Sequence, residues 1–371
     1  MNKKTSKYKK EFVQKRLNFL LGQSKNLDAI LVSSVSDITY LSENFRFSDT
    51  EREAFLLFTK NQNYFITDKR YSEAVSKKIQ DFILINSGAH LFLKKEAKEI
   101  FEKNKIKSLG IEVNNVTVYE HLLLRKFTKV KPFDLSNLRI IKQRNEIRNI
   151  KKACRIGDKT FEHILKQLKT GIREKEIEDA IESFIKKRNA DISFKPVVAF
   201  GKNSSVPHHH SGQTKLTKNM IVLLDFGVKV NNYCSDMTRT VFFGTASEKF
   251  RKIYQTVLEA QKKSIDHAKS SLQKRKIIKG RNLDNKARGY IIAKGFPTIP
   301  HSVGHGIGIE VHESPHLSPN SKDIIKPGMV FSIEPGIYIP NFGGVRIEDL
   351  FFIDNNRIEV LTHSTKQLIE L

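Results

Sequence analysis

Five acidic and imidazole side chains stand in apolar, strand-like runs in the second half of the chain. They are Asp225 in LLDFG, Asp236 in CSDMTRT, His305 in VGHGIG, Glu334 in SIEPGIY and Glu348 in VRIEDLF. Because a strand sends alternate side chains to opposite faces, several of these groups should point into the interior. A buried carboxylate costs on the order of several kcal/mol unless it is paired or binds a metal. The fold must therefore bring these acids to a common counter-charge.

Divalent cations are the counter-charge that the sequence favours. Lys and Arg are abundant, but only Arg239 and Arg346 lie next to these acids in the sequence. Four carboxylates and one imidazole form an oxygen-rich ligand set that suits two cations, and carboxylates can bridge metals about 3.5–4 Å apart. Water held between such ions is a nucleophile near neutral pH. A protein nucleophile is then unnecessary, in keeping with the lack of a GxSxG motif.

Composition narrows the partners and the location. The net charge of +25 raises the question of nucleic acid. However, Lys is spread along the whole chain without regular aromatic interleaving, so we predict no nucleic-acid partner. No apolar run approaches membrane-spanning length, and no apolar core follows the basic segment Met1–Phe12, which predicts a cytoplasmic protein without a membrane partner. Cys154 and Cys234 form no CxxC pair and are expected to be reduced and structural.

The chain length, 371 residues, predicts two domains. The first third alternates strands and helices, which predicts a small α/β domain over residues 1–138. Its expected strands are Leu27–Val32, Ala54–Phe58, Tyr64–Thr67 and Ser108–Val113, and its expected helices are Arg70–Gln80 and Lys94–Lys103.

The second predicted domain covers residues 139–371. With this domain included, the predicted fold class of the whole chain is α+β. A helical pattern over Asn145–Leu168 ends before Gly171, and Lys175–Lys187 carries an apolar stripe at helical spacing. The expected strands are Ile221–Asp225, Thr238–Phe243, Val330–Ile333 and Val345–Phe352, interrupted by a helix over Glu248–Gln273.

The segment His312-Glu313-Ser314-Pro315-His316 matches the HExxH pattern of zinc proteases. That motif requires both histidines on one face of a helix. Pro315 would break such a helix from within. We therefore predict that this match does not form a zincin site.

The motifs resemble the creatinase, prolidase and aminopeptidase P group of "pita-bread" metallopeptidases. The matching segments are SVPHHHSG (205–212), LLDFGVKVNNYCSDMTRT (223–240), HSVGHGIGIEVHE (301–313), PGMVFSIEPGIYIP (327–340) and GGVRIEDL (343–350). The resemblance implies a creatinase-like N-terminal domain followed by a pita-bread catalytic domain. It also implies cleavage of Xaa-Pro bonds and a homodimer.

The resemblance also implies a role for individual residues. The metal ligands would be Asp225, Asp236, His305, Glu334 and Glu348, with Asp236 and Glu348 bridging. Glu334 would also handle the proton of the attacking water, and His312 would stabilise the oxyanion. His208 would contact the substrate, at the expected 17 residues before Asp225. The substrate-binding surface would include His301 on the proline side, with Arg346 and Tyr338 steadying the carboxylates.

Several alternatives stay open at this point. The enzyme could be an aminopeptidase acting on longer peptides with proline second, or a dipeptidase acting on free Xaa-Pro. Methionine aminopeptidase shares the catalytic fold, but the additional N-terminal domain speaks against it. Creatinase and inert binding proteins of this fold lack metal ligands, whereas all five ligand positions are present here. For the two metal ions we expect Mn²⁺ first, with Co²⁺ and Zn²⁺ also able to bind.

Overall fold

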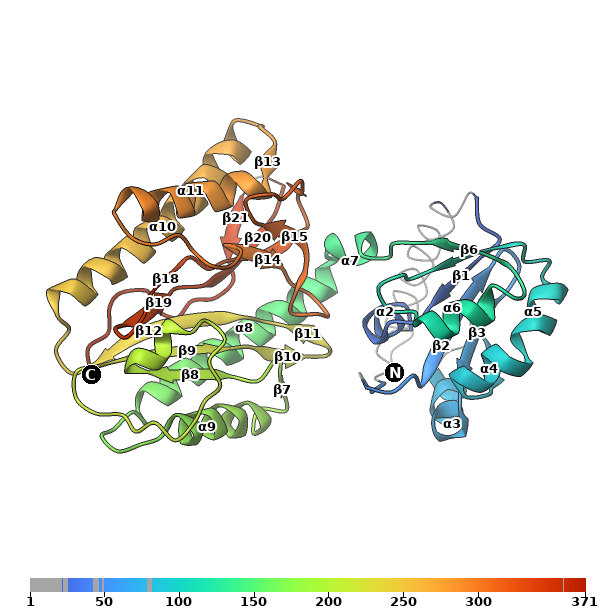
Figure 1. Cartoon of the computed structure of the whole chain (residues 1–371), viewed down its shortest axis with the longest axis horizontal. Coiled ribbons are helices and arrows are strands. Elements are labelled where there is room, and N and C mark those ends of the chain that lie inside the picture. The colour runs from blue at the N-terminus through green and yellow to red at the C-terminus, as the bar shows by residue number, and fades with distance from the viewer. Residues whose placement is uncertain (1–21, 23–25, 43–46, 49, 79–81, 356) are drawn as a thin grey trace. The chain divides into compact units, whose positions relative to one another are not determined.

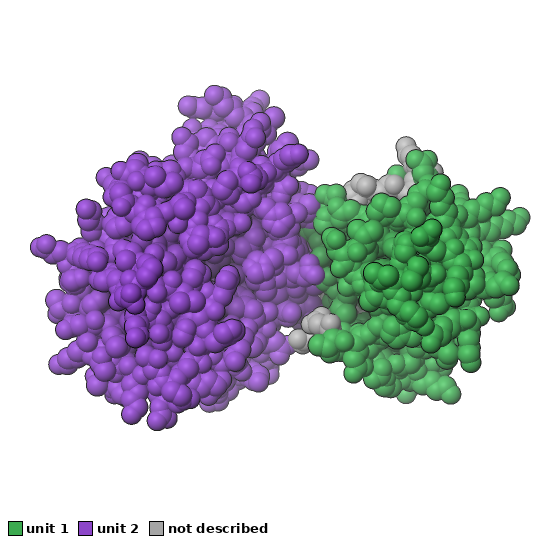
Figure 2. Space-filling model, in the orientation of Figure 1, with its two compact units in different colours: residues 1–139 green, residues 140–371 purple. Residues whose placement is uncertain are grey.

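The structure is a computed structural model, which describes residues 22, 26–42, 47–48, 50–78, 82–355 and 357–371. The chain divides into two compact units, residues 1–139 and 140–371 (Figure 2). The domain boundary expected near residue 138 lies beside this division. The basic segment Met1–Phe12 and the predicted helix end at Gln80 lie outside the described residues.

Unit 1 is built on a six-stranded mixed sheet with the order β4-β3-β2-β1-β5-β6. The strands are β1 (Ala29–Val32), β2 (Ala54–Thr59), β3 (Asn63–Thr67), β4 (Ile83–Asn86), β5 (Ser108–Ile111) and β6 (Lys129–Pro132). β2 and β3 form the predicted antiparallel hairpin, with Ala54 opposite Thr67. The helices are α2 (Val35–Leu41), α3 (Lys69–Lys78), α4 (Ala89–Lys95), α5 (Ala97–Lys103) and α6 (Val118–Leu124). The short helix α7 (Asn137–Ile140) spans the division between the units.

The single helix predicted over Lys94–Lys103 is wrong, because the chain forms two helices that meet at Glu96. The Glu96 N–H closes α4 by bonding to the Phe92 carbonyl at 3.0 Å. The Glu96 carbonyl then accepts the first bond of α5 from the Ile100 N–H at 3.1 Å. The break lets each half bury its own aromatic side chain, Phe92 in α4 and Phe101 in α5.

In unit 2, two helices cover one set of strands. The apolar stripe predicted for α9 (Glu174–Lys186) is confirmed, since Ile177, Ile181 and Ile185 are fully buried. α8 (Arg144–Leu165) ends before Gly171, whose φ of +91° suits glycine. These helices share a core with an antiparallel sheet of the order β12-β9-β8. The strands on this side are β7 (Asp191–Ile192), β8 (Val197–Phe200), β9 (Met220–Phe226), β10 (Val228–Val230), β11 (Tyr233–Cys234) and β12 (Met237–Phe243).

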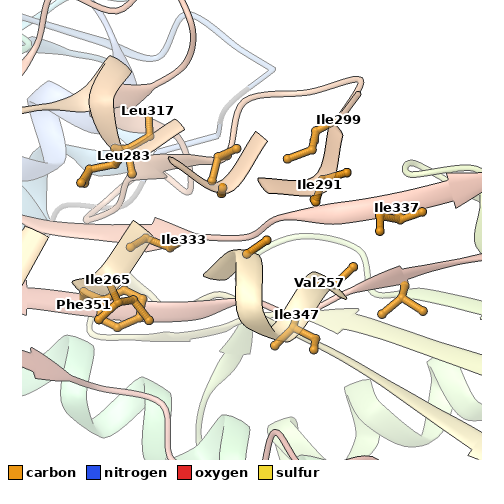
Figure 3. Packing of buried hydrophobic residues seen from close by; sticks show 14 of the residues in the cluster. Val257, Ile265, Leu283, Ile291, Ile299, Leu317, Ile333, Ile337, Ile347 and Phe351 are labelled. Carbon is orange, nitrogen blue, oxygen red and sulfur yellow. The ribbon is translucent and has the colours of Figure 1, made fainter. Parts of the chain in front are cut away.

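Two further helices, α10 (Glu248–Gln273) and α11 (Gly280–Ala293), cover the other side of unit 2, so the strands lie between two helical pairs (Figure 1). Their core packs Val257 and Ile265 of α10, and Leu283 and Ile291 of α11, against strand residues such as Phe351 (Figure 3). The strands here are β13 (Ile278–Lys279), β14 (Gly304–Gly306), β15 (Glu313–Leu317), β16 (Ile324–Ile325), β17 (Val330–Ile333), β18 (Gly336–Ile339), β19 (Gly343–Arg346), β20 (Asp349–Ile353) and β21 (Ile358–Val360).

The single strand predicted over Val345–Phe352 is also wrong. β19 pairs with β18, whereas β20 joins a different sheet beside β17. Between them the chain bonds to other segments, since the Glu348 N–H donates to the Thr238 carbonyl at 3.1 Å. Ile347, the residue before Glu348, is fully buried although it belongs to neither strand. Glu348 thus stands where the chain passes from one sheet to another.

Candidate metal centre and active site

A cavity of about 720 Å³ opens within unit 2. Its wall includes all five predicted metal ligands as well as His208, His301, His312 and Arg346. These side chains come from segments that are far apart in the sequence. The structure thus brings together nearly every site residue that the sequence singles out, and Tyr338 joins them through hydrogen bonds described below.

Asp236, His305 and Glu348 form the tightest group. Each offers one ligand atom, and these atoms lie within 4.8 Å of one another. Glu334 adds a fourth group, with its Oε1 atom 3.3 Å from Nε2 of His305. Asp225 belongs to β9, where it pairs with Thr238 of β12, two residues after Asp236. The antiparallel pairing of β9 and β12 therefore places the two aspartates beside each other.

The carboxylates of this group crowd one another. Burial, together with the charges of Glu348 and Asp225, raises the pKa of Asp236 well above its usual value. Burial, with the charges of Glu334 and Asp225, raises the pKa of Glu348 in the same way. Glu334 differs, because its contact with His305 outweighs burial and lowers its pKa to about 2.

Three buried carboxylate oxygens at this site accept no hydrogen bond from any described residue: Oδ1 of Asp225, Oδ1 of Asp236 and Oε1 of Glu348. Buried polar atoms are rarely left without a partner, because an unsatisfied one costs about 1–3 kcal/mol. Divalent cations would give these oxygens the partners that they lack. The donor set therefore fits hard or borderline divalent metal ions.

The ring of His305 is oriented for metal binding. Its Nδ1 atom lies 3.0 Å from the Gly306 carbonyl, which can only accept, so Nδ1 carries the proton in the neutral ring. The Nε2 lone pair then faces Asp236 and Glu334. Burial disfavours the imidazolium of His305, but Glu334 outweighs it and raises the pKa of His305 to about 9. A metal at Nε2 must therefore displace a proton.

Arg346 connects the predicted ligand Asp225 to Tyr338 and Thr238. Its Nη2 atom donates to Asp225, and its Nη1 atom donates to the Tyr338 hydroxyl at 2.8 Å. Nε donates to the Thr238 hydroxyl at 3.0 Å, and that hydroxyl donates to Oε2 of Glu348 at 2.8 Å. Sequence reasoning missed Thr238. Thr238 stands two residues after Asp236, at the start of the strand predicted from the sequence, and this closeness to a predicted ligand is the signal that could have found it.

His301 and Tyr338 form a pair on this network. The Nδ1 atom of His301 donates to the Ser302 carbonyl at 2.7 Å, and burial lowers the pKa of His301. Burial raises the pKa of Tyr338 to about 12, so its hydroxyl stays protonated. The Tyr338 hydroxyl therefore donates to Nε2 of the neutral His301 ring at 2.9 Å.

Five further histidines line the cavity: His208, His209, His210, His312 and His316. His312 is exposed, and its ring meets the His305 ring edge-on at 4.4 Å. His208 and His210 are exposed and line the cavity. His209 lines it as well, but its ring is held by the buried Glu174 at 3.0 Å. The three consecutive histidines therefore have different environments.

Two sequence expectations are resolved here. Four of the five residues of the HExxH match, residues 313–316, lie in β15 and none lies in a helix, which confirms that it forms no zincin site. Arg239 does not serve the four acids as a counter-ion, because its ion pair is with the buried Asp349 at 2.6 Å. Arg346 thus remains as the arginine that pairs with a metal-site carboxylate, Asp225.

Comparison with known proteins agrees with this geometry. Residues 148–355 match the model of metallopeptidase family M24, and residues 16–145 match the creatinase/prolidase N-terminal domain. An uncharacterized peptidase of Bacillus subtilis (strain 168) is 36% identical over 96% of this chain and 99% of its own length. This chain belongs to metallopeptidase family M24.

Solved M24 structures extend the similarity to the whole fold. An Xaa-Pro dipeptidase from Bacillus anthracis has a TM-score of 0.87 and 35% identity, covering 97% of this chain and 99% of that chain. An X-Pro aminopeptidase from Thermotoga maritima MSB8 has a TM-score of 0.82 and 28% identity, covering 96% and 100%. The predicted fold, a creatinase-type domain followed by a pita-bread catalytic domain, is confirmed.

The described helices of this M24 chain bury apolar residues on one face and expose polar residues on the other, as α10 illustrates. Within the described ranges, none is both long enough and apolar enough to cross a membrane. The longest, α10, has 26 residues but interleaves its buried positions with charged ones such as Lys262, Lys263 and Asp266.

Proposed function

We propose that this chain is an Xaa-Pro metallopeptidase that works with two divalent ions. The ligands would be Asp225, Asp236, His305, Glu334 and Glu348. The three buried carboxylate oxygens without a hydrogen-bond partner are the observation that carries this proposal. Similarity to an Xaa-Pro dipeptidase and an X-Pro aminopeptidase supports the substrate class.

The bound ions would lower the pKa of a water molecule so that it can attack the peptide carbonyl. Glu334 would accept the proton of that water, since its low pKa keeps the carboxylate ionised. His312 lies beside His305 and would donate a hydrogen bond to the oxygen that becomes negative in the transition state. Partial desolvation and the charge of His305 lower the pKa of His312, and the neutral ring still carries one N–H donor.

The other cavity residues would bind and orient the peptide. His208 would contact the substrate, and His301 would face its proline side. The hydrogen bonds of Arg346 to Asp225 and Tyr338 would hold a ligand and the His301–Tyr338 pair in a fixed relation. Phe194, Val197 and other apolar residues supply a wall against which side chains of the peptide can pack. For the metal we propose Mn²⁺ first, because oxygen-rich sites suit it.

The test compares hydrolysis of Ala-Pro, Ala-Pro-Ala and the control Ala-Ala by the full chain, first stripped of metal and then supplied with Mn²⁺. We expect no hydrolysis after stripping and recovery with Mn²⁺ on a proline-containing peptide. Preference for Ala-Pro identifies a dipeptidase, and preference for Ala-Pro-Ala identifies an aminopeptidase. A metal-loaded protein that cleaves none of the three peptides contradicts the proposal, as does full activity without metal.

A further inference from the structure

Glu174 is a buried carboxylate outside the metal centre on which four donors converge. Oε1 accepts from the Phe200 N–H at 2.7 Å and from the Asn203 side-chain amide at 2.8 Å. Oε2 accepts from the Gly212 N–H and the His209 ring, both at 3.0 Å. The Glu174 side chain has no exposed surface. One carboxylate thus ties together both ends of the segment 200–212.

This segment carries the three consecutive histidines that line the cavity. After the 3-10 helix η1 (Gly201–Ser205) it turns, with the His209 N–H bonded to the Val206 carbonyl at 3.2 Å. The residues on either side of His208 are both anchored. The Pro207 carbonyl accepts from Nη1 of Arg346 at 3.4 Å, and the His209 ring bonds to Glu174. His208 itself is exposed toward the cavity, and no hydrogen bond joins its side chain to another described residue.

We propose that Glu174 and His209 are positioning residues that fix the direction in which His208 faces the substrate. The inference rests on the proposed function, in which His208 contacts the peptide. Because His208 has no side-chain anchor of its own, its direction is set by the backbone on both sides. Arg346 fixes the preceding peptide unit, and the Glu174–His209 bond fixes the following residue. Neither positioning residue touches the reacting atoms.

His209 offers a cleaner test than Glu174. Removing the carboxylate would leave two backbone N–H groups and an amide without an acceptor, which endangers folding. His209→Phe removes one of the four donors and keeps a ring of similar size. His209→Gln removes the ring but keeps an N–H donor as many bonds from Cα as Nε2 of histidine, so it should restore much of the bond. His267→Phe, in α10 and outside the cavity lining, is the matched control.

The experiment is a double-mutant cycle on the metal-loaded full chain, with kcat and KM measured on the better proline peptide. We expect His209→Phe to lower kcat/KM by about ten- to a hundredfold, the range for a misplaced substrate contact, chiefly by raising KM. Bound metal should stay at the wild-type level, and His209→Gln should recover most of the loss. In a His208→Ala background, His209→Phe should cost nothing further, because its effect passes through His208.

Two outcomes overturn the inference: wild-type kinetics in His209→Phe, or an equal loss from His209→Phe with and without His208. A purely structural role predicts that second result, together with a loss that His209→Gln does not rescue. An inactive wild type counts instead against the proposed function. If the wild type is inactive, the positioning of His208 is tested instead by the rate at which diethyl pyrocarbonate modifies His208. We expect that rate to rise in His209→Phe and to stay unchanged in His267→Phe; an unchanged rate in both refutes the positioning.

Discussion

Thr238→Val should weaken metal binding although Thr238 is not one of the proposed metal ligands. Its buried hydroxyl accepts from Nε of Arg346 at 3.0 Å and donates to Oε2 of Glu348 at 2.8 Å. Valine has nearly the same shape, so the change removes both hydrogen bonds with little loss of packing. Glu348 then loses the contact that holds one oxygen while the other stays free for a cation.

The size of the effect follows from these two bonds. A hydrogen bond to a charged group contributes about 1.5–3 kcal/mol, and loss of a partner that orients a metal ligand typically weakens metal affinity by about 10–100-fold. That range corresponds to about 1.4–2.7 kcal/mol of binding free energy. We therefore expect the dissociation constant for Mn²⁺ to rise by about one to two orders of magnitude. At saturating Mn²⁺, much of the activity should return.

The assay is a calorimetric titration of the metal-free protein with Mn²⁺, followed by activity measured against free Mn²⁺. Thr238→Ser keeps the hydroxyl and should bind metal nearly as well as the wild type. Thr256→Val removes a buried hydroxyl that, among the residues the structure describes, bonds only to the Lys252 carbonyl within α10, so it should leave the affinity unchanged. Equal Mn²⁺ affinity in Thr238→Val and the wild type would refute the argument.

Four further substitutions probe the site and the core. Asp236→Ala and Glu348→Ala should each abolish turnover, because a bridging ligand serves both ions, and near-normal peptide hydrolysis in either variant would contradict a two-metal site. His312→Ala should retain bound metal but slow kcat by about 10²–10³-fold, the usual loss for one oxyanion donor; metal analysis showing an empty site would mean that the residue has another role. Phe351→Ala should reduce the free energy of unfolding by about 3–5 kcal/mol, because the fully buried ring leaves a cavity. A denaturant titration measures this, and a loss below about 1 kcal/mol would show that the core collapses around the change.

Much of the fold could be predicted from the sequence because its signals are local. α10 and β17 begin and end where periodicity and apolar runs place them. The acids that gather in the cavity also left a local signal, since a carboxylate in an apolar strand is costly wherever it stands. A carboxylate in an apolar strand indicates that the residue needs a partner, but it does not indicate which residue or ion that partner is.

What could not be predicted depends on contacts between distant segments. The break at Glu348 was not predicted for the segment Val345–Phe352, because it reflects which strands β19 and β20 meet in the folded chain. Arg239 stands near an acid in the sequence, yet it pairs with Asp349, 110 residues later. Thr238 has an ordinary hydroxyl whose importance depends on Arg346 and Glu348 reaching it. Sequence identifies residues that need partners more readily than it identifies the partners.

The crowding of the carboxylates also predicts how the stability of the metal-free protein depends on pH. Because the pKa of Asp236 is raised by burial and by Glu348 and Asp225, the native metal-free protein holds a proton that the unfolded chain releases above about pH 4. The contribution of this proton to the free energy of unfolding is therefore fully present below about pH 4 and is lost as the pH rises through the raised pKa of Asp236. Asp236→Asn cannot ionise, so the variant avoids this loss.

We expect the metal-free Asp236→Asn variant to have a higher Tm than the metal-free wild type at pH 8 and a smaller advantage at pH 5. Adding Mn²⁺ should reverse the order, because a ligand that binds only the native state stabilises it by about 2.7 kcal/mol at a concentration one hundred times its dissociation constant. Thermal unfolding at both pH values, with and without Mn²⁺, measures the difference in Tm between the variant and the wild type under each condition. A metal-free variant that is less stable than the wild type at pH 8 would show that the Asp236 carboxylate is not held at a cost. Metal binding would then release no stored repulsion, and the site would owe its affinity to ligand geometry alone.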